Sequence, residues 1–205
     1  MFMSKNSFFI FACAFFLSAC AVAPFSNHTT GRTNGAGQSH LVVGSTIGNL
    51  RVPVVKYDIG VLDNLDLGFD YEVATLGAQA KVGFMDAKSD GFAIAALAGA
   101  GNGGNGYYVY GGPAMSYKYD ILEPYSVIRY NYVHFNSSQT QLGGLGTLSI
   151  PAGRYSYMMY TLGLSVMALD WLGFSGEYTF LGGTGSGTTI ISRSGYPSAA
   201  VNFKF

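Results

Sequence analysis

Ala199-Ala200-Val201-Asn202-Phe203-Lys204-Phe205 ends the sequence, and apolar and polar side chains alternate strictly along this stretch. In a β-strand, successive side chains point to opposite faces, so the odd-numbered residues would share one apolar face. The even-numbered residues would share the other face. An apolar face toward lipid and a polar face toward a wet interior are typical of strands in a membrane β-barrel.

The aromatic end of this stretch carries a resemblance. Phe203 and Phe205 lie in one register, and the pattern resembles the C-terminal signal by which bacterial outer-membrane barrels are recognised for assembly. The resemblance implies that the protein is located in the bacterial outer membrane. Its partners would then be outer-membrane lipid and the barrel assembly machinery.

The N-terminus has the pattern of a secretory signal peptide. Lys5 supplies a positive charge, and residues 7–19 are apolar but too few to cross a bilayer, which needs about 20 residues. The stretch ends in Leu17-Ser18-Ala19-Cys20, which resembles the lipobox of bacterial lipoproteins. The resemblance implies that Cys20 is lipidated and begins the mature chain. The alternative is cleavage at a small-residue site such as Ala21-Val22-Ala23, which would remove Cys20.

The following residues separate this signal from the barrel. Residues 21–39 are polar, contain glycine and show neither the strand nor the helix period. We therefore predict a signal peptide at 1–19, a lipidated periplasmic tether at 20–39 and an outer-membrane β-barrel at 40–205. Such a tether would let a lipid on Cys20 reach the inner leaflet of the outer membrane.

Composition excludes several classes of function. Charged residues make up 11% of the chain, against about 25% in soluble domains. Without Lys5, ten Lys and Arg residues face eleven Asp and Glu, a net charge near −1 that implies no nucleic-acid partner. Both cysteines precede residue 21, and the three histidines share no ligand spacing. We therefore expect no disulfide, metal or cofactor.

From residue 40 onward, apolar residues recur with a period of two, which predicts an all-β, antiparallel up-and-down transmembrane barrel. About ten strands fit the pattern, an even number as single-chain bacterial barrels require, and 8 or 12 are possible. The predicted strands lie near residues 40–47, 53–61, 65–73, 76–85, 91–99, 107–119, 125–135, 154–169, 172–181 and 196–205.

The predicted links between strands differ at the two ends of the barrel. Links rich in Asp, Asn or Pro are short, and they alternate with mostly longer links rich in Gly and Ser. Short periplasmic turns and longer outer loops are typical of outer-membrane barrels, and they would place both chain ends on the periplasmic side. The short links are 62–64, 86–90, 120–124 and 170–171, and the Gly- and Ser-rich ones are 100–106, 136–153 and 182–195.

Charged residues of the predicted strands share the parity of the inward face. On one strand Lys56 and Asp58 alternate with apolar residues or Tyr, and a charge on the lipid face would cost about 2–4 kcal/mol at the midplane. Because five inward basic residues match five acidic ones, we expect paired charges that fill the lumen. The predicted network comprises Lys56, Asp58, Asp66, Asp70, Glu72, Lys81, Lys118, Arg129, Glu177 and Lys204.

Two glycine-rich stretches have no phosphate-binding signature. Gly99–Gly106 and Gly182–Gly187 lack the Lys-Ser/Thr ending of a phosphate-binding loop. We therefore interpret both as outer loops.

Three functions are compatible with such a barrel, and the ligand stays open. The leading hypothesis is a structural or surface-interaction role, and the alternative is a narrow pore or small-solute carrier. A third comes from His134 with Ser137 and Ser138, which resembles the serine and histidine of outer-membrane lipid A deacylases at the lipid-facing rim. That family places its serine two residues after the histidine, where this chain has Asn136. We therefore predict no catalytic residues and no enzymatic activity.

Overall fold

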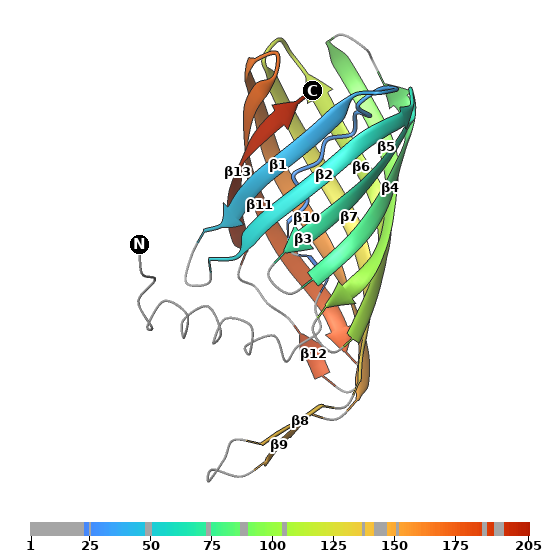
Figure 1. Cartoon of the computed structure of the whole chain (residues 1–205), viewed down its shortest axis with the longest axis vertical. Helices are drawn as coiled ribbons and strands as arrows, with labels where there is room; N and C mark the ends of the chain where they lie inside the picture. The colour runs from blue at the N-terminus through green and yellow to red at the C-terminus, as the bar shows by residue number, and fades with distance from the viewer. Residues whose placement is uncertain are drawn as a thin grey trace, which may run out of the picture.

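The protein is described by a computed structural model that covers residues 23–24, 26–47, 51–72, 75–86, 90–103, 106–136, 138–141, 147–150, 152–185, 188–190 and 195–205. The predicted signal peptide, Cys20 and Ser137 lie outside these residues. Within them, ten strands form the wall of a barrel (Figure 1). They are β1 (Ser39–Thr46), β2 (Pro53–Leu62), β3 (Leu65–Glu72), β4 (Thr75–Asp86), β5 (Gly91–Gly103), β6 (Gly106–Lys118), β7 (Leu122–Phe135), β10 (Gly153–Leu169), β11 (Leu172–Gly185) and β13 (Tyr196–Lys204).

Antiparallel pairing closes this wall on itself. Each strand of the wall pairs with the next wall strand along the chain, so that β7 pairs with β10 and β11 with β13. β13 also pairs with β1. Phe203 lies opposite Leu41 of β1 and Leu172 of β11, so the last strand joins the first. The predicted up-and-down barrel is therefore confirmed, and the C-terminal alternation is that of its closing strand. Closure leaves no free sheet edge in the wall.

The regions predicted as long loops contain more strand than expected. β5 and β6 leave only residues 104–105 between them, and β11 continues to Gly185. Two short strands, β8 (Ser138–Gln141) and β9 (Thr147–Ile150), form a separate hairpin, and β12 (Thr188–Ile190) pairs with β11. These extensions are rich in Gly, Ser, Thr and Gln. They lack the apolar period that marks a strand in lipid, so sequence periodicity could not reveal them.

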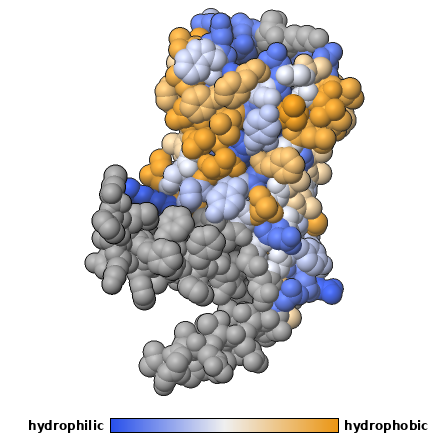
Figure 2. All heavy atoms as spheres, viewed as in Figure 1, coloured by the Kyte–Doolittle hydropathy of each residue, from blue (hydrophilic) through white to orange (hydrophobic). Residues whose placement is uncertain are grey.

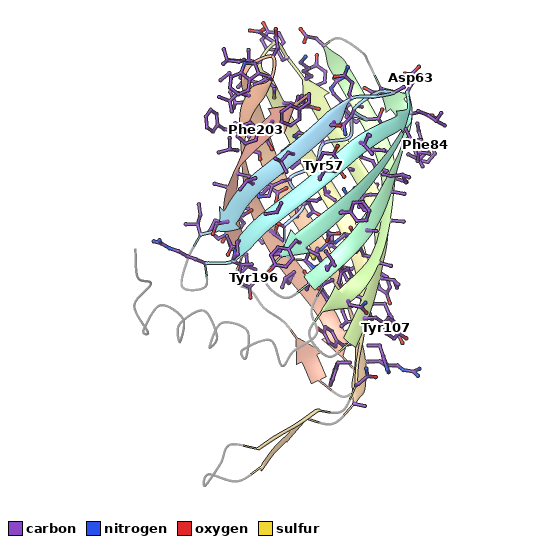
Figure 3. All side chains as sticks on the ribbon, viewed as in Figure 1. Tyr57, Asp63, Phe84, Tyr107, Tyr196 and Phe203 are labelled. Atoms are coloured by element: carbon purple, nitrogen blue, oxygen red, sulfur yellow. The ribbon has the colours of Figure 1, made fainter. Side chains whose placement is uncertain are left out.

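The two ends of the barrel are built differently. At one end, which we call the turn end, β-strands are joined by links 63–64, 87–90, 119–121 and 170–171. At the other, which we call the loop end, the link 136–152 carries the β8–β9 hairpin. Figure 3 shows Asp63 near the turn end and Tyr107 near the loop end. β1 begins and β13 ends at the turn end, as the sequence predicted.

The outer surface of the wall is apolar. The predicted outward residues of β2 and β3 are exposed, for example Phe69 at 64% and Tyr57 at 40%, while the alternate residues are buried. Figure 2 shows apolar side chains gathered over the visible wall, with polar ones toward its end. Within the described residues, no helix is long and apolar enough to cross a membrane.

Candidate functional site

The N-terminal part of the described chain lies inside the barrel. We call residues 23–24 and 26–34 the lumen segment. Ser26, Asn27, His28 and Thr29 are each at most 4% exposed, although all four are polar. The sequence predicted a periplasmic tether over residues 20–39, whereas residues 26–29 are buried inside the barrel. The reason is that the wall supplies hydrogen-bond partners for the segment, and buried polar groups are stable when they are paired.

The lumen segment runs from the loop end to the turn end. Ala23 is fully buried in an apolar cluster with Tyr108 and Tyr157, which lie near the loop ends of β6 and β10. At the other end, the Asn34 amide donates to both carboxylate oxygens of Asp66, at 3.0 and 3.1 Å, beside the turn that begins β3. The segment therefore runs lengthwise through the lumen. The N-terminal end of the lumen segment therefore lies toward the loop end, and its C-terminal end lies at the turn end.

A tight turn connects the lumen segment to the wall. Gly35 and Gly37 have φ angles of 86° and 78°, a region that glycine adopts without steric cost. The Gly37 amide donates to the Gly60 carbonyl at 2.8 Å, and the Gly60 amide donates to the Gln38 carbonyl at 2.9 Å. The chain then enters β1 at Ser39. The turn thus reverses the chain from the lumen into the barrel wall.

Toward the loop end, one acidic and one basic wall residue hold the segment. Glu72 accepts hydrogen bonds from the Ser26 amide at 3.2 Å and the Ser26 hydroxyl at 3.1 Å. Arg129 is 1% exposed, and it donates to the Pro24 carbonyl and, at 3.2 Å, to the Asn27 side-chain oxygen. The guanidinium also lies over the Tyr110 ring, 4.3 Å from its centroid, which is a cation–π contact.

In the middle of the lumen, the segment binds the carboxylate of Glu177. The backbone amides of Asn27 and His28 both donate to it, the first at 3.0 Å. The Tyr125 hydroxyl donates to the same carboxylate at 2.9 Å. The Asn27 side-chain amide reaches Thr161 on β10 at 2.6 Å. Glu177 therefore binds consecutive backbone amides as an anion would at a helix N-terminus, with no helix present.

At the turn end, the contacts become ion pairs. Arg32 of the segment lies 3.3 Å from Asp86 and 3.1 Å from Glu123. The wall residues Lys81 and Asp66 lie 3.0 Å apart, and Lys81 also donates to the Thr29 hydroxyl at 3.4 Å. The segment thus joins charges from different strands into one network.

The remaining residues of the predicted lumen network occupy two places. Lys56, Asp58 and Asp70 are buried in the lumen, and Lys56 donates to the Asn27 carbonyl at 2.5 Å instead of to a neighbouring carboxylate. Lys118 and Lys204 line a polar cavity of about 420 Å³ at the turn end, between the segment and the wall. Lys118 and Lys204 are thereby at the barrel mouth, where β6 and β13 end.

The residues of the deacylase hypothesis are only partly described. His134 lies on β7 at the loop end, where its ring packs at a tilt of 36° against Tyr107 with centroids 5.0 Å apart. Ser137 lies outside the described residues, and of Ser138 only the backbone is described. No group of three His, Cys, Asp or Glu residues that could hold a metal occurs in the described ranges.

Several lumen residues were not identified from the sequence. Asp86 and Glu123 were assigned to turns, although β4 and β7 include them. Gln79 of β4 bridges Lys56 and Asp58 by hydrogen bonds. It lies two residues from Lys81, so the strand period could have placed its side chain on the same inward face. The lumen segment itself gave no signal, because an extended polar chain has no period.

The ion pair at the turn end leads to a test of the lumen network. We expect Lys81→Met to lower the free energy of unfolding, by about 3–5 kcal/mol if burial is complete, because Asp66 would lose its buried partner. Lys88→Met, in the link between β4 and β5, should change it far less. Urea unfolding in lipid vesicles measures both. Equal effects would show that Lys81 contributes no more than a residue of a link.

Comparisons with known proteins concern the fold alone. No model of a protein family matches the sequence, and no curated protein is significantly similar to it. The N-terminal β-barrel domain of Pseudomonas aeruginosa OprF is similar at 9% identity and a TM-score of 0.40, over 83% of this chain and 99% of that one. Ail, the attachment invasion locus protein of Yersinia pestis, is similar at 13% identity and a TM-score of 0.35, again over 83% and 99%.

Proposed function

We propose that this protein is a bacterial outer-membrane β-barrel whose lumen is closed by its own N-terminal segment, and that it serves a structural or surface-interaction role. The observation that carries the proposal is the lumen segment, which is hydrogen-bonded to buried wall residues from Pro24 to Asn34. A lumen occupied in this way carries no bulk traffic.

The distribution of polarity supports membrane insertion. Apolar and aromatic side chains cover the outside of the wall, while the charged residues of β2 and β3 are buried inside. Short links at one end and the hairpin at the other match periplasmic turns and outer loops. The turn end would then face the periplasm. The β8–β9 hairpin at the loop end would be available for contacts at the cell surface.

The proposal includes lipidation at Cys20, supported by Leu17-Ser18-Ala19-Cys20 at the end of the apolar stretch. It also includes Phe203 and Phe205 as an assembly signal, supported by their position in the strand that closes the barrel. Cleavage that removes Cys20 is the competing form of the mature chain.

A narrow pore or small-solute carrier is the second candidate function. The polar cavity at the turn end favours it, because Lys81, Lys118 and Lys204 line a space of about 420 Å³ and bring three amines to it. The deacylase hypothesis has His134 at the rim, and release of acyl chains from lipid A by the purified protein would test it.

Conductance tests the closed lumen directly. Purified wild-type protein in planar bilayers should show no steady channel current, because the segment and its partners fill the path. Stable, ion-selective currents from the wild type would contradict the closed barrel and favour the pore. The full-length mature chain must be used, since the segment is its N-terminal part.

A further inference from the structure

The direction of the lumen segment fixes where the chain before it must leave the barrel. Ala23 is 0% exposed and packs in the cluster formed by Tyr108, Val133 and Met159. Val133 is two residues from the loop end of β7, and Tyr108 two residues from that of β6. The Tyr157 hydroxyl donates to the Ala23 carbonyl at 3.5 Å. The first described residue is therefore held in the loop-end half of the lumen.

Chain length then limits the position of Cys20. Cys20 precedes Ala23 by three residues, and a fully extended chain spans at most about 11 Å over three residues. The segment itself needs eleven further residues to reach the turn end at Asn34. With the lumen segment in place, Cys20 can therefore reach the rim of the loop end but not the turn end.

We infer that the mature N-terminus leaves the barrel through the loop end, so that an acyl group on Cys20 lies in the outer leaflet of the outer membrane, at the cell surface. The inference rests on the proposed orientation, in which the loop end faces outward. It reverses the leaflet that the sequence predicted, because a periplasmic tether would have placed the lipid on the other side.

This arrangement has a mechanical consequence. The lumen segment is continuous with β1 at the turn end, through the turn at Gly35 and Gly37. A lipid at the other end would keep the segment from sliding back toward the periplasm. Together with the hydrogen bonds to Glu72 and Glu177, the lipid would hold the lumen closed from both ends.

Labelling of single introduced cysteines with a membrane-impermeant maleimide tests the inference in intact cells. The variants are Val22→Cys before the segment, Ala36→Cys at the exposed turn end and Gln139→Cys in the β8–β9 hairpin. Val22→Cys and Gln139→Cys should be labelled in intact cells. Ala36→Cys should be labelled only after the outer membrane is permeabilised. The wild type measures any background from Cys20, whose sulfur is blocked when it carries a lipid.

Other patterns would overturn the inference. Protection of Val22→Cys in intact cells, with labelling after permeabilisation or only after denaturation, would mean that the N-terminus is not displayed outside. Labelling of Ala36→Cys but not Gln139→Cys in intact cells would mean that the turn end, and not the loop end, faces outward. An intact mass showing that the mature chain starts after Val22 would mean that the mature protein lacks Cys20 and its lipid. The proposed closure of the lumen is contradicted by channel currents from the wild type and not by any of these labelling patterns. The two proposals can therefore fail independently.

Discussion

Deletion of residues 23–34 is expected to turn the closed barrel into a conducting one. The deletion removes the chain that crosses the lumen and leaves the strands and their pairing intact. It also removes Arg32, the only Lys or Arg of the segment. Seven acidic residues then remain at the lumen (Asp58, Asp66, Asp70, Glu72, Asp86, Glu123 and Glu177) against five basic ones (Lys56, Lys81, Lys118, Arg129 and Lys204). Currents should therefore be steady and prefer cations.

Planar-bilayer recording of the deletion variant beside the wild type measures this effect. A synthetic peptide of residues 23–38, added to the conducting variant, should reduce its current, because the peptide restores the partners of the lumen wall. A scrambled peptide of the same composition is the matched control. A folded, heat-modifiable deletion variant without currents would show that the wall alone closes the lumen.

Replacement of Glu177 is expected to have a large effect on both the stability of the barrel and the closure of its lumen. Glu177 is 5% exposed and accepts hydrogen bonds from the amides of Asn27 and His28 and from the Tyr125 hydroxyl. Glu177→Gln keeps the shape but removes the charge, and one of the two accepting oxygens becomes an NH2 group that faces the donors of that oxygen. Hydrogen bonds to a charged group are worth about 1.5–3 kcal/mol each. We expect a loss of several kcal/mol of unfolding free energy and brief channel openings.

Urea unfolding in lipid vesicles and bilayer recording check both consequences. Asp170→Asn is the matched control, because Asp170 is an exposed acidic residue in the link between β10 and β11. It should leave stability and conductance unchanged. A Glu177→Gln variant as stable and as silent as this control would mean that Glu177 does not hold the lumen segment.

The wall of the barrel could be predicted from the sequence because the face of each strand residue follows from its immediate neighbours along the chain. In Val55-Lys56-Tyr57-Asp58 the side-chain period of two assigns each residue to a face, and lipid penalises any error in that assignment. The structure has the same parity, with Lys56 and Asp58 buried. Strand bounds agree within a few residues wherever apolar and polar residues alternate along the strand. They fail at the end of β5, residues 100–103, where small and polar residues carry no apolar period.

The occupant of the lumen was decided only by tertiary structure. Asn27 lies 150 residues from Glu177 and 102 from Arg129 along the chain, and no local pattern links positions so far apart. The sequence indicated a filled, charge-paired lumen from the balance of inward charges. It did not indicate that an extended polar segment fills it, because such a segment has no period and gains its place only from partners that barrel closure brings together.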